Sequence, residues 1–343
     1  MGRIKNLEEI KAMVRARTGR RNVFRRARKE DVEPVLAELT SKDPELWAAA
    51  WARAGARYER QAVGHERAGR GREAAADNLM AYTYYTIGRY PAPHTPGKMA
   101  CFKKSLELYE KAGRAFAPPL EKASIPYGGK VIPAYLRLPQ SGGKNPVVIN
   151  FGGIDSFKAE CYEYDEALLA AGLGACAVDM PGVGECPVKG SATAETLFSA
   201  VIDYFEKRPE IDPARIAVMG RSFGGYWAAK TAFVEPKRLR AAVVWGGGVH
   251  YFFQAEWLKK STHAESYLMD HDVARCAAFG VESLDQLAEI FPSLSLKTQG
   301  WLDRPSCPML AVNGKDDLQT PIEDLYILLE HGAPKSARVF PGG

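Results

Sequence analysis

The sequence lacks the features of membrane, secreted and metal-dependent proteins. No stretch approaches the roughly 20 consecutive apolar residues that a membrane-spanning helix needs. The N-terminal sequence MGRIKNLEEIK has no apolar core of a secretory signal. The six cysteines show no CxxC spacing, and HxH and HExxH patterns are absent as well. The sequence therefore predicts a cytoplasmic protein with reduced thiols, without membrane association and without a metal site.

Glycine-rich cofactor loops are also missing. No GxGxxG follows a predicted strand. The run DMPGVGE (residues 179–185) lacks the spacing of a phosphate loop and the Lys-Ser/Thr pair that would follow it. We therefore predict no organic cofactor and interpret this run as the loop after a strand.

The net charge of +5 is concentrated in one segment. Residues 1–30 hold eleven Lys and Arg against three Glu, whereas the remaining chain has 35 basic and 38 acidic residues. The stretch RTGRRNVFRRARK could hold nucleic acid through phosphate charge, or serve as a transit peptide, which Glu8 and Glu9 disfavour. We favour a solvated helix, or an arm that packs on a neighbouring subunit. Nucleic acid is thus not the expected partner, and a homodimer is compatible with the sequence.

Helical periodicity dominates the first 120 residues. Large apolar side chains recur at three- and four-residue steps, which predicts helices over 43–69, 73–90 and 98–116. The aromatic residues of these segments are expected to form a helix–helix core rather than a pocket. The sequence therefore predicts a helical N-terminal domain over residues 1–120, including the basic arm.

From residue 121 the pattern changes to alternating strands and helices. A hairpin is predicted around Gly128-Gly129. Buried strands and helices then alternate to the C-terminus, except that residues 250–300 are helical and rich in aromatics. Such alternation is typical of a doubly wound α/β fold with a mostly parallel sheet. We therefore expect a catalytic domain over 121–343, with a helical insertion over the sheet's carboxyl edge.

One serine lies where chemistry is expected. In GRSFG, Ser222 falls between a predicted strand and a predicted helix, which is the context of a nucleophile elbow. The turn is so sharp that neighbouring side chains would clash, which accounts for Gly220 and Gly224. Ser222 is therefore the candidate nucleophile, and the helix after it directs amide groups at an oxyanion.

An acid and a base should follow the serine in the chain. The loop PMLAVNGKDDLQTP offers Asp317 as the acid, with Asp316 as the alternative. The base belongs after the final strand, SARVF, but no histidine stands there, and His331 falls in the preceding predicted helix. We expect the catalytic histidine just after Gly343, in a longer chain. The alternative is a hydrolase fold that has lost its base.

Further candidates lie in the neighbouring loops. The oxyanion donors are expected to be the amides of Phe223 and of Gly153, with Ile154 as the second choice for the latter. Asp155 either contacts substrate or caps a helix. His250 and Tyr251, at the end of another strand, are candidates for pocket-lining polar groups, although a lone histidine there also fits a structural role.

These motifs resemble those of the α/β-hydrolase superfamily. NFGGIDSFKAE, GRSFGGYWAAK, WGGGVHYFF and NGKDDLQTP are similar to the branch that contains 2,6-dihydroxypseudooxynicotine hydrolase, fungal polyketide-shortening pigment hydrolases and fermentation–respiration switch-like esterases. The likeness covers nearly the whole chain. It implies that residues 1–120 and 250–300 form a lid over the active site.

The resemblance also implies a reaction. We expect a serine-triad hydrolase that cleaves a C–C bond next to a ketone, in a 1,3-dicarbonyl, polyketide or acyl-phenolic substrate, through an acyl-enzyme. A carboxylesterase or lactonase with the same triad is the alternative, and a non-catalytic binding protein with this fold is a second one. The aromatic-rich lid segments suit a small, apolar or aromatic carbonyl substrate.

Overall fold

The structure is a computed structural model of the 343-residue chain, and it describes residues 5–139, 143–262, 264–332 and 334–342. The chain forms two compact units. The helical unit contains the residues up to Leu120 together with Leu268–Ala274, and the α/β unit contains the chain from Glu121 onward apart from that short segment.

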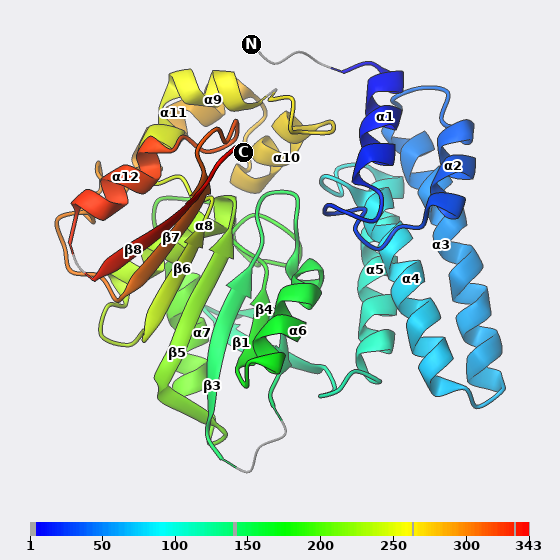
Figure 1. Cartoon of the computed structure of the whole chain (residues 1–343), viewed down its shortest axis with the longest axis horizontal. Coiled ribbons are helices and arrows are strands. Elements are labelled where there is room, and N and C mark those ends of the chain that lie inside the picture. The colour runs from blue at the N-terminus through cyan, green and yellow to red at the C-terminus, as the bar shows by residue number, and fades with distance from the viewer. Residues whose placement is uncertain (1–4, 140–142, 263, 333, 343) are drawn as a thin grey trace. The chain divides into compact units, whose positions relative to one another are not determined.

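Five helices precede Leu120 in the described part of the helical unit, and three of them begin at a side-chain cap (Figure 1). Asn6, Asp43 and Thr95 accept hydrogen bonds from first-turn amides, and prolines follow Asp43 and Thr95 directly. The three long helices lie where the periodicity predicts them. The helices are α1 (Leu7–Arg17), α2 (Lys29–Glu38), α3 (Pro44–Arg67), α4 (Gly71–Arg89) and α5 (Pro96–Gly113).

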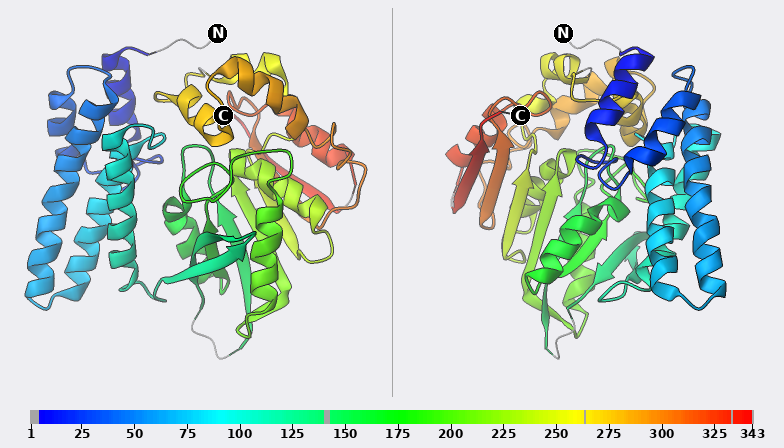
Figure 2. Two further views of the ribbon diagram at one scale, coloured as in Figure 1. Left: turned by 180° about the vertical axis from the view of Figure 1, so that it is seen from behind. Right: turned by 45° about the vertical axis from the view of Figure 1, so that its right-hand side comes forward.

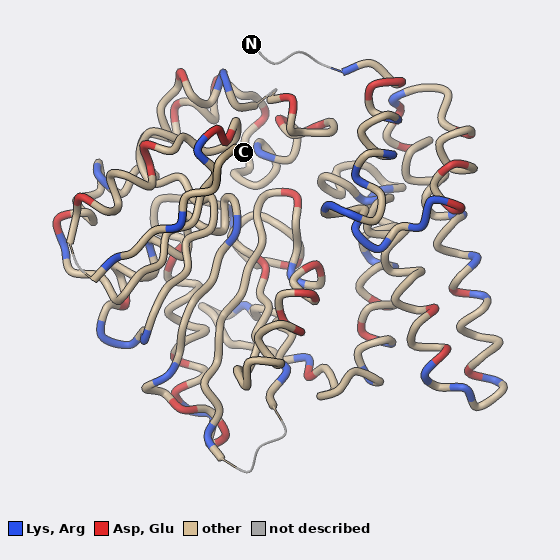
Figure 3. Tube along the Cα trace, in the orientation of Figure 1, with Lys and Arg blue, Asp and Glu red and all other residues tan. Residues whose placement is uncertain are grey.

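The basic segment belongs to this helical unit. Lys and Arg residues gather along the connection between α1 and α2 (Figure 3). That connection is anchored, because Phe24 is fully buried and its ring lies 6.0 Å from the ring of Trp51. The segment is therefore a packed turn with basic side chains on its outside, and not an extended arm.

An aromatic core holds α3 and α4 together. The rings of Trp51 and Tyr84 stack at 6.2 Å, and both side chains are fully buried. Asp31 of α2 is buried against them and accepts hydrogen bonds from the hydroxyls of Tyr58, at 2.7 Å, and Tyr84. The aromatic residues of these helices thus form core, as expected.

The α/β unit is built on one eight-stranded sheet with the order β1-β2-β4-β3-β5-β6-β7-β8. The first two strands form the predicted antiparallel hairpin, β2 pairs antiparallel with β4, and the remaining neighbours are parallel. The strands are β1 (Glu121–Tyr127), β2 (Lys130–Arg137), β3 (Asn145–Phe151), β4 (Gly174–Val178), β5 (Ile211–Arg221), β6 (Ala241–Trp245), β7 (Met309–Gly314) and β8 (Lys335–Phe340).

Helices cover both faces of this sheet (Figures 1 and 2). Along β5, Val218 and Gly220 are buried on one face, whereas Met219 and Arg221 point to the other face. The first face carries α7 (Thr196–Glu206) and α8 (Phe223–Val234), and the second carries α6 (Tyr162–Ala170). This arrangement confirms the predicted doubly wound α/β fold with a mostly parallel sheet.

The chain between β6 and β7 is helical, as expected. Helices α9 and α11 lie beyond the carboxyl ends of the parallel strands (Figure 1). The elements of this insertion are η2 (Tyr251–Phe253), α9 (Ala255–Thr262), α10 (His271–Phe279), α11 (Leu284–Ile290) and η3 (Phe291–Leu294), and α12 (Glu323–Glu330) follows β7. His331 directly follows α12, one position outside the helix in which it was predicted. No helix within the described ranges is long and apolar enough to cross a membrane.

Candidate active site

Ser222 has a strained backbone at the junction of β5 and α8. Its φ of 57° and ψ of −128° lie in a region that residues with a side chain rarely occupy. The turn is held on both sides, because Ser222 N donates to the carbonyl of Trp245 at 2.7 Å and Gly225 N donates to the carbonyl of Ser222 at 2.8 Å. Ser222 is half-buried and opens α8, so the first amides of that helix lie next to it.

Glycines make this turn sterically feasible. A Cβ on Gly224 would collide with the carbonyl oxygen of Gly152, and a Cβ on Gly220 would collide with the carbonyl of Gly224. On the neighbouring loop, a Cβ on Gly153 would lie 2.9 Å from Cβ and 3.1 Å from Oγ of Ser222. The loop after β3 therefore touches the serine side chain directly, as a loop carrying an oxyanion donor must.

The loop after β3 is closely packed from Gly152 to Lys158. Ile154 is only 4 % exposed, and Ser156 N donates to the carbonyl of Gly153 at 3.4 Å. Asp155 is half-buried at the tip of this loop. The N–H of Phe157 donates to Oε1 of Glu160 at 3.1 Å.

A buried ion cluster anchors the end of this loop. Lys158 Nζ lies 2.9 Å from Asp179 Oδ2 and also bonds Glu185, and the Lys158 N–H donates to Asp179 Oδ1 at 2.7 Å. Burial alone would lower the pKa of Lys158, but the charges of Asp179 and Glu185 outweigh it and keep the pKa above its usual value. Both acids belong to the run DMPGVGE, so this loop supplies the counter-charges of a lysine that holds the candidate oxyanion loop.

Asp317 lies in the loop after β7, at the same sheet edge. Its Oδ1 accepts hydrogen bonds from the N–H of Gln319 at 2.7 Å and of Thr320 at 3.3 Å, which orients the carboxylate. The hydroxyl of Thr320 donates to the carbonyl of Gly246. Gly246 directly follows Trp245 of β6, whose carbonyl accepts the N–H of Ser222. Asp316 is exposed.

The histidine expected after Gly343 lies outside the described residues. Nδ1 of His331 lies 3.8 Å from Oδ1 of Asp303. Nδ1 of His250 lies 2.7 Å from the hydroxyl of Ser295, and Leu296 N donates to the carbonyl of Val249 at 2.8 Å. His250 thus joins the two ends of the insertion, while the Tyr251 side chain is exposed.

A carboxylate that sequence reasoning missed fixes the same region. Asp324 of α12 is fully buried and accepts the N–H groups of His250, Tyr251 and Phe252 at 2.7 to 2.8 Å. Burial raises the pKa of Asp324 to about 6, although these backbone hydrogen bonds oppose the rise. Asp324 thus holds the start of the insertion, and nothing in its helical sequence context distinguishes it from a surface carboxylate.

Sequence reasoning also missed two residues of the insertion, Tyr267 and Arg275. Arg275, 1 % exposed, donates to the hydroxyls of Thr262 at 2.9 Å and Tyr267 at 3.3 Å. Burial raises the pKa of Tyr267 to about 12, and the negative charges of Asp155 and Asp317 contribute to the rise. Tyr267 therefore lies near both the oxyanion loop and the Asp317 loop. Both residues come from the insertion, whose sequence carries no motif.

The serine turn, the touching glycine loop and the oriented carboxylate lie at the carboxyl edge of a mostly parallel sheet, as in α/β-hydrolase enzymes. Residues 26–338 match the family model described as esterase FrsA-like, so the chain belongs to the FrsA-like esterase family. The fold and family resemblance inferred from the motifs is therefore confirmed.

Two relatives illustrate the range of this family. Esterase FrsA of Photobacterium profundum is 29% identical over 293 residues, covering 83% of this chain and 68% of the relative. The 2,6-dihydropseudooxynicotine hydrolase of Paenarthrobacter nicotinovorans is 31% identical over 229 residues, covering 66% of this chain and 59% of the relative. The chain thus matches less than two thirds of the length of the latter.

Solved structures agree on the fold. The crystal structure of 2,6-dihydroxy-pseudo-oxynicotine hydrolase has a TM-score of 0.78 at 24% identity, covering 92% of this chain and 86% of that one. Wild-type AbyA5 has a TM-score of 0.76 at 23% identity, covering 98% and 88%. At these identities the likeness concerns the fold alone. Within the described part of the chain, no cluster of three or more His, Cys, Asp or Glu could hold a metal ion.

Proposed function

We propose that Ser222 is the nucleophile of a serine hydrolase that attacks a carbonyl carbon and forms an acyl-enzyme. The observation that carries this proposal is the strained Ser222 turn, with φ of 57°, against which Gly153 packs within contact distance of the hydroxyl. Strain of this kind persists only where surrounding structure imposes it, and it concentrates at catalytic sites. The amides of Phe223 and of Gly153 or Ile154 are the proposed oxyanion donors.

The proposed mechanism uses these groups in turn. Ser222 Oγ bonds to the carbonyl carbon and loses its proton to the base, whose ring Asp317 orients. The oxyanion donors stabilise the tetrahedral intermediate. The bond to the leaving group then breaks, its electron pair stays on the leaving group, and the base returns the proton there. Water finally releases the acid from Ser222. We propose a histidine as this base, as in other serine triads.

We favour a carbon leaving group, so that the enzyme cleaves a C–C bond. The substrate would be a 1,3-dicarbonyl, polyketide or acyl-phenolic compound whose C–C bond next to a ketone is cleaved, since one relative is by name the 2,6-dihydropseudooxynicotine hydrolase. An enolate or phenolic carbanion is a workable leaving group because the neighbouring carbonyl or ring spreads its charge. The second candidate is a carboxylesterase or lactonase, which the family's description as esterases favours.

The test compares full-length protein with Ser222→Ala and with Ser199→Ala, a control serine on α7. Each is incubated with aryl 1,3-diketones and with p-nitrophenyl esters, and products are identified by mass spectrometry. We expect Ser222→Ala to lower kcat at least about 10⁴-fold and Ser199→Ala to leave it unchanged. Acid and ketone from the diketones support C–C hydrolysis, whereas ester turnover alone moves the assignment to esterase. Full activity of Ser222→Ala would overturn the proposal.

A further inference from the structure

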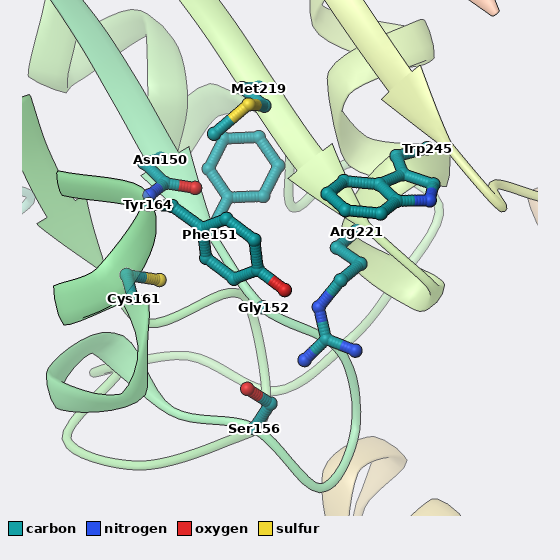
Figure 4. Close-up of a pocket in the computed structure, with 9 residues that line it drawn as sticks. All are labelled: Asn150, Phe151, Gly152, Ser156, Cys161, Tyr164, Met219, Arg221 and Trp245. Carbon is teal, nitrogen blue, oxygen red and sulfur yellow. The ribbon is translucent and has the colours of Figure 1, made fainter. Parts of the chain in front are cut away.

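A mostly apolar pocket with one charged residue lies on the α6 face of the sheet, next to the Ser222 turn. A pocket there is lined by residues of β3, the loop after it, α6, β5 and β6 (Figure 4). The lining residues are Asn150, Phe151, Gly152, Ser156, Cys161, Tyr164, Met219, Arg221 and Trp245. All belong to the α/β unit, and none is a candidate catalytic residue.

The charge in this pocket is that of Arg221. Its side chain lies on the opposite face of β5 from the buried Gly220. Within the described ranges, the side chain of Arg221 makes no hydrogen bond or ion pair, and its Nε is buried without a partner. Two fully buried lysines of this unit, by contrast, have counter-charges: Lys158 has Asp179 and Lys230 has Glu195. A buried donor without a partner is costly, and a ligand that accepts from it is one way to offset that cost.

Aromatic rings surround the guanidinium. Its carbon lies 6.0 Å from the ring centre of Tyr164, and the rings of Tyr164 and Trp245 meet edge to face at 5.7 Å. The guanidinium and the hydroxyls of Tyr164 and Ser156 lie around the same opening (Figure 4). Trp245 is 40 % exposed, which is high for a tryptophan on a sheet face. Its ring is therefore available to a flat group at the pocket mouth.

Asp165, the acidic residue near the pocket, does not compensate the positive charge of Arg221. Asp165 is fully buried behind Asn150, whose Nδ2 donates to it at 3.1 Å. Burial raises the pKa of Asp165 to about 7, so near neutral pH it carries only part of a negative charge. The nearby Cys161 is a thiol, because burial raises its pKa well above the usual value.

We propose that this pocket binds a carboxylate carried on a flat apolar group, with the carboxylate on Arg221 and the apolar group against Trp245. A planar guanidinium matches the two oxygens of a carboxylate. The closed part of the pocket has room for about one water-sized group, so one carboxylate oxygen enters and the rest of the ligand stays at the mouth. Because Gly152 and Ser156 belong to the loop that carries Gly153 and Ile154, an occupied pocket bears directly on that loop.

The site is tested by direct binding, independently of any hydrolytic activity. Benzoate, and benzamide as its neutral isostere, are titrated into the protein by calorimetry at low and high ionic strength. We expect benzoate to bind in the millimolar range, more weakly at high salt, and benzamide not to bind measurably. Arg221→Gln should weaken benzoate binding at least tenfold. Arg240→Gln removes the same charge from an exposed arginine and should not change the affinity.

A second variant covers the case in which Arg221→Gln disturbs the turn. Trp245→Ala changes an exposed side chain, and we expect it to weaken benzoate several-fold while acetate, which lacks the flat group, is unaffected. Circular dichroism checks that each variant is folded. Equal binding of benzoate and benzamide, unchanged affinity in folded Arg221→Gln, or absence of benzoate binding to the wild type would each overturn the proposal.

Discussion

Each unit buries an aspartate, but the pKa of the aspartate is lowered in the helical unit and raised in the α/β unit. In the helical unit, Asp31 is buried with hydrogen bonds from Tyr58, Tyr84 and Arg57. Burial pushes the pKa of Asp31 up, but these donors outweigh it and the pKa lies below its usual value. In the α/β unit, Asp165 accepts a hydrogen bond from the Asn150 amide, and burial raises its pKa to about 7. Three donors, among them the charged Arg57, outweigh burial at Asp31, whereas the single Asn150 amide does not outweigh it at Asp165.

Glycines in the two units can differ in the space that is available for a side chain. In α3 of the helical unit, Gly64 is exposed and a Cβ there would meet nothing within 4 Å. In the α/β unit, Gly224 has no room for a Cβ because the carbonyl of Gly152 occupies that position. The glycine at the strained serine turn therefore has no room for a side chain, whereas the glycine on the surface of α3 does.

The largest effect is expected at the buried ion cluster. Lys158→Met removes the ammonium and leaves Asp179 as an uncompensated buried charge, which should lower the free energy of unfolding of the α/β unit by about 3–5 kcal/mol. Lys237→Met, which changes an exposed lysine, is the control and should have no measurable effect. Urea unfolding measures the loss, and hydrogen exchange should locate it in the β3–α6 and 179–185 peptides.

A double variant sharpens this test. If the loss comes from the unpaired charge, adding Asp179→Asn to Lys158→Met should restore part of the stability. A double variant less stable than Lys158→Met would contradict this explanation and indicate that packing dominates.

The second-largest effect is expected for Gly224→Ala. The added methyl group forces Gly152 and the candidate oxyanion loop away from the serine turn, at a cost of about 3 kcal/mol in stability. A shift of about 1 Å in reacting groups lowers kcat on the order of 100-fold. Unfolding in urea and turnover of a p-nitrophenyl ester measure the two effects.

The matched change in the helical unit should have the opposite sign. Gly64→Ala replaces an exposed helical glycine and is expected to stabilise α3 by roughly 0.5–1 kcal/mol. Equal destabilisation by both substitutions would refute the contrast between the units.

A further difference between the units concerns the pH dependence of stability. Because the folded pKa of Asp165 is raised, its contribution favours folding below about pH 4 and is lost as the pH rises towards about 7. Asp165→Asn removes this dependence. We expect its stability relative to the wild type to improve by on the order of 3 kcal/mol between pH 5 and pH 8.

Asp31→Asn is the comparison in the helical unit. The folded pKa of Asp31 is lowered, so its contribution is present above about pH 4 and lost as the pH falls below that value. This variant should be less stable than the wild type at both pH 5 and pH 8, with little change between them. Parallel pH profiles of the two variants would show that the donors do not set these pKa values.

Much of the fold was predictable because it follows from local patterns. Periodicity and caps such as Asp43 determine the helices. The Gly128-Gly129 hairpin and the alternation of strands and helices follow from turn and pattern rules. The serine turn was predictable because its glycines are required by sterics that act over a few residues. The contacts of Lys158, Arg221, Tyr267 and Asp324 were not, because each depends on partners from distant segments.

The sequence by itself determined the elements, the hydrolase class and the position of Ser222 at a strand–helix junction, since these depend on side-chain size and period along the chain. Only the tertiary structure decided which charges meet. Lys158 finds two acids, whereas Arg221 makes no ion pair with any described residue and faces a pocket. The physical reason is that a charge has no preferred partner along the chain. Its surroundings, and therefore its energy, exist only once the sheet has brought distant loops together.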